Sequence, residues 1–103
     1  MDWKEQVEGL KAKYGPLMLV ENGVVSILVR TPTRTEFKIF SAAVMDPAKQ
    51  VFAIEDLGAT CVVFPDAKTY DSILDKRPGL AVQVGKAAES LGTGAEEVRT
   101  KKL

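Results

Sequence analysis

The dipeptide Asn22-Gly23 is the sequence feature that most restricts how this chain can fold. It interrupts the run PLMLVENGVVSILVR, residues 16–30, which is otherwise rich in β-branched and aliphatic side chains. Asn-Gly is the strongest short signal for a type I′ β-hairpin, because both turn residues must adopt positive φ. A two-residue turn would place Glu21 opposite Val24. The sequence therefore predicts an antiparallel hairpin whose register is set by this turn.

Both faces of the predicted hairpin are rich in apolar side chains. The first face carries Met18, Val20, Val25, Ile27 and Val29. The second face carries Leu17, Leu19, Val24 and Leu28, mixed with polar residues. An isolated hairpin is marginally stable, so this one must lie on helices or join another sheet. We expect helices to cover one face, and we predict that the four apolar residues of the second face are available to a partner.

A helix is predicted before the hairpin, and four helices are predicted after it. Apolar residues recur with helical spacing at Trp3, Val7, Leu10 and Tyr14. After the hairpin, Thr33 to Glu36 has the pattern of a capping box, and Asp46-Pro47 is a typical second helix start. The four later helices are expected at about 33–46, 46–63, 66–77 and 78–91. The stripes expected to face inward from the first two are Phe37, Phe40 and Val44, then Val51, Ile54, Leu57 and Cys61.

This order of elements predicts an α+β fold with an N-terminal helix, one β-hairpin and a bundle of about four short helices. A chain of 103 residues is long enough for one domain with its own core. We expect residues 1–92 to form that single domain. Residues 93–103 have little to bury and are expected to form a flexible C-terminal tail.

The composition argues against several classes of function. The chain has no histidine and one cysteine, Cys61, so it has neither a disulfide of its own nor a zinc site built from Cys and His. No Ser, Thr or Cys can use a histidine base. No apolar run has the length of a membrane span, and the N-terminus lacks the features of a signal peptide. We therefore expect a cytoplasmic, non-enzymatic protein with no cofactor, no metal and no membrane partner.

Nucleic-acid binding is the least favoured of the remaining functions. The 14 basic and 14 acidic residues cancel, so no net field would attract the chain to a phosphate backbone. Arg30, Arg34 and Lys38, near Phe37, are the residues on which such a function would depend. We expect no nucleic-acid partner.

Several short motifs occur in a characteristic order along residues 17–92. They are Arg30 with Pro32 to Arg34, Glu36 and Phe37; Asp46 to Lys49; Cys61 to Val63 with Pro65 and Asp66; Tyr70; and Pro78 to Leu80. As an ordered set they resemble the small tail assembly chaperones of long-tailed bacteriophages. None of these motifs is a catalytic fingerprint.

The resemblance implies a function without catalysis. Chaperones of this family coat the long helical tape measure protein in the host cytoplasm before the tail tube forms around it. The implied partner is thus the tape measure protein or another tail protein, and self-association is compatible with that function. If the second hairpin face does not bind the client, we expect the binding groove among the helices around Phe37 and Phe40. The alternative is a small phage-encoded inhibitor or adaptor whose hairpin extends a partner's sheet.

Overall fold

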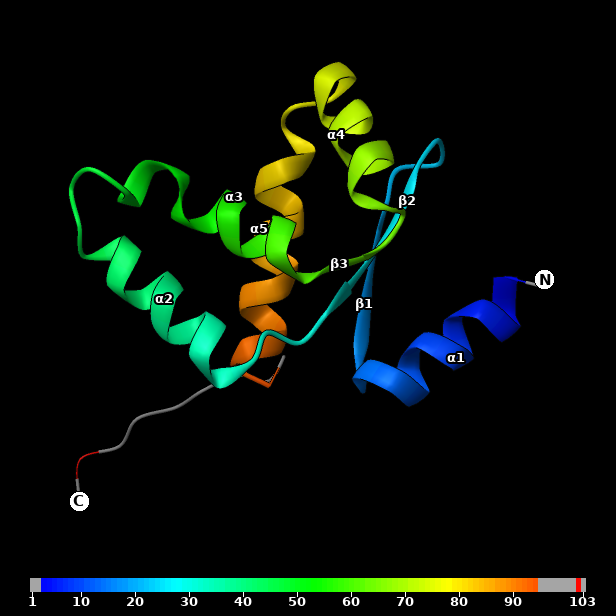
Figure 1. The fold of residues 1–103 in the computed structure, drawn as a ribbon, viewed down its shortest axis with the longest axis horizontal. Helices are drawn as coiled ribbons and strands as arrows, with labels where there is room; N and C mark the ends of the chain where they lie inside the picture. The colour runs from blue at the N-terminus through cyan, green and yellow to red at the C-terminus, as the bar shows by residue number, and fades with distance from the viewer. Residues whose placement is uncertain (1–2, 95–101, 103) are drawn as a thin grey trace.

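The described part of the chain, residues 3–94 and 102, contains five helices and a three-stranded antiparallel sheet in this computed structural model (Figure 1). The elements are α1 (Trp3–Tyr14), β1 (Leu17–Glu21), β2 (Ser26–Arg30), α2 (Arg34–Val44), α3 (Gln50–Cys61), β3 (Val62–Phe64), α4 (Ala67–Lys76) and α5 (Leu80–Gly92). The α+β class and the order of helix, hairpin and helices are confirmed. Of the predicted C-terminal tail, residues 95–101 and 103 lie outside the described residues.

Two of the helix starts predicted near residues 33, 66 and 46 agree with the structure. Thr33 caps α2 in a complete capping box with Glu36, and the Asp66 side chain accepts a hydrogen bond from the backbone of Thr69 to cap α4. The third prediction is wrong by about one turn: Asp46 caps a separate turn, and α3 begins at Gln50.

The hairpin is present, but its register differs from the prediction. Glu21 pairs with Ser26 instead of Val24, so the loop contains four residues. The Asn22 side chain explains the longer loop, because its Oδ1 accepts hydrogen bonds from the backbone N–H groups of Val24 and Val25, both at 3.0 Å. The partner of each β1 residue has moved by two positions. Every side chain within the two strands therefore remains on its predicted face, whereas Val24 and Val25 lie in the loop.

A third strand was not predicted. The preceding helix was expected to continue to about residue 63, yet Val62–Phe64 pairs with β2, with Phe64 opposite Leu28 and Val62 opposite Val29. Three apolar residues are too short a run for periodicity to distinguish strand from helix. The sheet order is β1-β2-β3, so β2 is the central strand.

The first face of the sheet forms the core. Ile27 and Val29 of β2 are completely buried and belong to one cluster with residues of α3, α4 and α5. The helical members of that cluster are Leu57, Cys61, Tyr70, Val84, Ala87 and Ala88.

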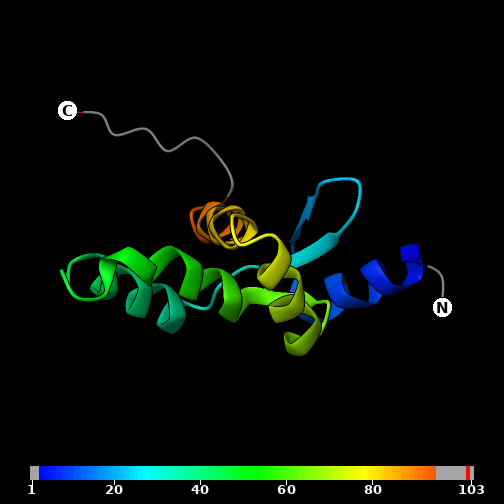
Figure 2. The same ribbon diagram turned by 90° about the horizontal axis from the view of Figure 1, so that it is seen from above.

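Helices α3 and α5 approach each other closely through two glycines. A methyl group at Gly58 would come within 2.6 Å of the backbone nitrogen of Gly85. A methyl group at Gly85 would overlap the carbonyl oxygen of Ile54. The two backbones therefore touch where a side chain would normally separate them. This contact places α3, and with it α2, beside the core (Figure 2).

Helix α1 contributes to covering the second face of the sheet. The ring of Trp3 meets the ring of Phe64 edge to face, with 5.1 Å between centroids. Phe64 is the cross-strand neighbour of Leu28, so these two side chains share a face. Leu28 is 3% exposed. Both faces at the centre of the sheet are therefore covered within the chain.

Candidate functional site

The second hairpin face is not a continuous binding surface. Leu28 is buried, and Leu17 is half-buried. Leu19 and Val24 are 43% and 71% exposed, but Val24 lies in the loop beyond the end of the strands. The expectation of an open surface containing all four residues is thus wrong at Leu28, because the third strand and the contact of α1 with it were not foreseen.

The two aromatic residues of the second candidate surface lie on α2 and face different surroundings. The rings of Phe37 and Phe40 meet edge to face at 5.5 Å between centroids. Phe37 lies against Gly92 at the end of α5, whereas Phe40 lines a groove between α2 and α3. Phe40 thus contributes to a candidate binding site, whereas Phe37 contributes to the packing of α2 against the end of α5.

That groove is a mostly apolar hollow between α2 and α3. It has a volume of about 470 Å³ and lies within the helical hairpin of α2 and α3, which projects to the side opposite α1 (Figure 1). The apolar residues that line it are Ile39, Phe40, Ala43, Ala48, Phe52, Ala53 and Leu57. We call this the α2–α3 groove. Its rim is open to solvent, since Ile39 is 66% and Phe52 59% exposed.

The exposed apolar surface continues past the groove onto the tip of the helical hairpin. Val44, Met45 and Val51 are exposed there, although Val44 and Val51 were expected to face inward. The apolar stripes predicted for these two helices do not include Ile39, Met45 or Phe52. Those unassigned residues were the sequence signal of a second apolar surface on the same helices.

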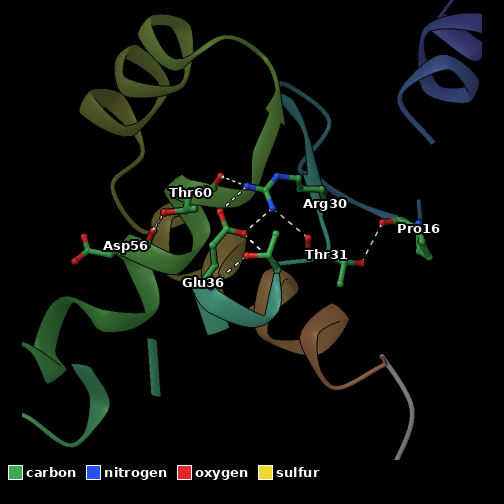
Figure 3. Close-up of polar contacts among 7 residues, drawn as sticks. Pro16, Arg30, Thr31, Glu36, Asp56 and Thr60 are labelled. Carbon is green, nitrogen blue, oxygen red and sulfur yellow. Dashed lines mark hydrogen bonds and ion pairs between the residues drawn. The ribbon is translucent and has the colours of Figure 1, made fainter. Parts of the chain in front are cut away.

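A charged cluster closes the other end of the groove (Figure 3). Arg30 at the end of β2 forms a bidentate pair with Glu36 of α2, with Nη–Oε distances of 2.8 and 2.9 Å. Arg30 also donates to the carbonyl of Thr60 near the end of α3 at 3.1 Å. Glu36 in turn accepts from the backbone N–H of Thr33 at 2.8 Å. This Arg30–Glu36 clamp joins the sheet to both walls of the groove.

The clamp changes the acidity of Glu36. The hydrogen bonds from Arg30 lower the pKa of the Glu36 carboxyl from 4.5 to about 2. A group with a lowered folded-state pKa stabilises the fold above its unfolded pKa, and the stabilisation is lost as the pH falls towards the folded value. The Glu36 contribution is therefore complete at neutral pH and declines between about pH 4.5 and pH 2.

We expect Glu36→Gln to lower the free energy of unfolding at pH 7 by about 1 to 2 kcal/mol, a value reduced for the partial solvent exposure of the pair. Gln keeps the shape and the capping hydrogen bond but removes the charge. Denaturant unfolding of both proteins at pH 7 and pH 3 measures the effect. The difference in free energy of unfolding between the two proteins should be smaller at pH 3 than at pH 7. An equal difference at both pH values would contradict the assigned role of the carboxylate.

The other side chains considered from the sequence are Cys61 and the basic residues Arg30, Arg34 and Lys38. Burial raises the pKa of the Cys61 thiol to about 11, which leaves it in the unreactive protonated form. Arg30 is held in the clamp, while Arg34 and Lys38 line a hollow beside Phe37 on another side of α2. Within the described ranges, no three His, Cys, Asp or Glu residues gather as metal ligands would. None of the described helices has both the length and the apolar character needed to cross a bilayer.

Comparison with known proteins identifies the fold but no family. No protein-family model matches the sequence, and no curated protein matches it. Among solved structures, the chain is similar to the uncharacterised protein rbstp2171 from Bacillus stearothermophilus, with a TM-score of 0.70 over 93% of this chain and 99% of that one. The two sequences are 18% identical. The likeness therefore shows a shared α+β fold.

Proposed function

We propose that this protein is a non-enzymatic tail assembly chaperone that binds the tape measure protein of a long-tailed bacteriophage in the host cytoplasm. The observation that carries the proposal is the α2–α3 groove, an apolar hollow with solvent-exposed walls. Exposed apolar surface of this kind is typical of an interaction site. The groove would bind a helix of the client through its apolar stripe.

The shape of the groove suits a helical ligand. Its walls are two neighbouring helices joined by a short connection, and an amphipathic helix that binds such a groove inserts apolar side chains at i, i+3, i+4 and i+7. Phe52 and Ile39 stand on opposite walls and would flank those side chains. A long helical client could present many equivalent stripes, so one groove could bind it without reading a unique sequence.

Two of the motifs behind the resemblance to tail assembly chaperones lie at the ends of this groove. Asp46 to Lys49 forms the connection between α2 and α3 at one end. Arg30 and Glu36 form the clamp at the other end. Residues that are far apart in the motif order thus support one surface, and this arrangement favours the groove over the hairpin as the client site.

The decisive experiment is co-expression of the protein with the tape measure protein encoded in the same phage genome, followed by co-purification. We expect Phe52→Glu to reduce the recovered client by tenfold or more, because it places a charge on the apolar wall that the client helix would contact. The far-ultraviolet circular dichroism should stay near wild type, because the Phe52 side chain is largely exposed.

Val24→Glu is the matched control, since it places the same charge at an exposed apolar position of the hairpin loop. It should leave client recovery unchanged. A folded Phe52→Glu protein that retains the client would refute the groove as the binding site. Loss of the client in Val24→Glu alone would instead favour the hairpin.

A second candidate function rests on the edge of the sheet. β1 pairs with β2 on one side and has no strand partner on the other among the described residues, and Leu19 on it is partly exposed. Such an edge can accept an extended segment of another protein. An inhibitor or adaptor that works through its hairpin would use this edge, and its binding should survive Phe52→Glu, which alters only the groove.

A further inference from the structure

Two charged residues lie at opposite ends of the α2–α3 groove. Lys49 lines it beside the connection between α2 and α3, and Asp56 lines it near the end where α3 meets the clamp. Neither residue has an ion-pair partner in the parts of the chain that the structure describes. In Figure 3 the carboxylate of Asp56 points away from the guanidinium of Arg30. Both charges are therefore available to a ligand in the groove.

The third charged residue of the lining does not disturb this arrangement. Glu36 is paired with Arg30 through two hydrogen bonds, so its charge is already compensated. The groove thus has a basic end at Lys49 and an acidic end at Asp56. An apolar ligand with no charges would leave both groups without a partner.

The spacing of the two charges matches that of a helix. Lys49 is the N-cap residue of α3, and Asp56 follows seven residues later. Seven residues are close to two helical turns, which puts both side chains on the same face of α3, about 10 Å apart along its axis. Two residues separated by seven on a ligand helix that lies along α3 would have the same spacing.

From this charge complementarity we propose that the groove binds an amphipathic helix in one direction, which is set by the charges on that helix. The ligand helix carries an acidic residue next to Lys49 and a basic residue next to Asp56, seven positions apart and beside its apolar stripe. The inference rests on the proposed function of the groove as the client site. It adds the polarity and the charge pattern of the client segment.

Charges at the rim of an interface fix register and partner choice more than they raise affinity. We therefore expect each pair of opposite charges to raise the affinity for the ligand helix moderately, and each pair of like charges to lower that affinity clearly. The apolar stripe supplies most of the affinity, and the charges decide which way the helix lies. Both charge effects should weaken as salt is raised.

The probes are three synthetic helical peptides with one leucine stripe and two flanking charged positions seven residues apart. The first carries Glu and then Lys, the second two Glu residues, and the third two Lys residues. Affinities are measured by fluorescence anisotropy for the wild type, Lys49→Glu and Asp56→Lys. We expect the wild type to bind the mixed peptide three- to tenfold more tightly than the other two. Lys49→Glu should prefer the two-Lys peptide, and Asp56→Lys should prefer the two-Glu peptide.

A nitroxide at the N-terminus of the mixed peptide tests the direction. In wild type it should broaden the amide signals around Met45, because the N-terminal Glu lies near Lys49. A peptide with Lys first and Glu second should broaden the signals around Thr60 instead.

The outcomes separate this inference from the proposed function. Equal affinities for all peptides across the three proteins, or broadening at both ends of the groove with one peptide, would overturn the polarity while leaving the groove as a helix-binding site. Failure of every peptide to bind the wild type, together with loss of client co-purification, would overturn both proposals.

Discussion

Gly85→Ala is expected to lower the free energy of unfolding by about 3 kcal/mol or more, at the upper end of the usual cost of overpacking. The added methyl group would overlap the backbone carbonyl of Ile54, and backbone atoms cannot move aside as a flexible side chain can. Helices α3 and α5 would have to separate along the contact that also carries Gly58 and Val84. Thermal unfolding should show a fall of roughly 12 °C or more in a domain of this size.

Gly9→Ala is the matched control for this prediction. Gly9 is also in the interior of a helix, α1, but a methyl group there meets no atom within 4 Å. Alanine should therefore stabilise the protein by about 0.5 to 1 kcal/mol through helix propensity alone. If Gly85→Ala lowers the free energy of unfolding while Gly9→Ala raises it, the close contact of α3 with α5 is the cause of the loss. A neutral Gly85→Ala would show that the two helices can move apart at little cost.

Leu28→Glu is the second substitution with a large expected effect. Removal of a buried leucine side chain costs about 2 to 5 kcal/mol, and a buried carboxylate without a partner adds a desolvation cost. We expect a loss of about 4 kcal/mol or more in denaturant unfolding, which is a large fraction of the stability of an ordinary small domain. Such a loss would show that the second hairpin face is part of the core at this position.

Leu19→Glu provides the comparison on the same face. Leu19 lies directly opposite Leu28 across the strand pair, yet it is partly exposed on the edge strand. We expect a change within about 1 kcal/mol, since exposed substitutions usually have small effects. If Leu28→Glu were tolerated as well as Leu19→Glu, the covering of this face by β3 and α1 would be contradicted.

The candidate site could be predicted from the sequence only in part. Phe40 was included in a candidate surface, and it does line the α2–α3 groove. Ile39 and Phe52 were missed because a helix with two apolar surfaces has no single stripe, and periodicity then describes the buried surface alone. Leu28 was included wrongly because alternation along a strand shows which side a residue faces but not what covers that side.

The sequence by itself determined the features that depend on neighbouring residues. The capping box at Thr33, the cap at Asp66, the end of α1 before Gly15 and the turn at Asn22 each arise from hydrogen bonds or backbone angles within a few residues. The division of the hairpin into two faces was equally local, because it depends on alternation. For that reason it was unaffected by the error in register.

The tertiary structure alone decided the features that join distant segments. β3 is a strand because Val62 and Phe64 pair with residues of β2 that lie more than thirty positions earlier in the sequence. The position of the groove depends on the close contact of α3 with α5 at Gly58 and Gly85. It also depends on the hydrogen bond from Arg30 that joins α3 to the sheet. These contacts depend on which backbones can approach closely in space. No local pattern of apolar and polar residues encodes that distance. Leu57 and Cys61 of α3 therefore became part of the core, while Ile39 of α2 and Phe52 of α3 remained exposed beside an apolar groove.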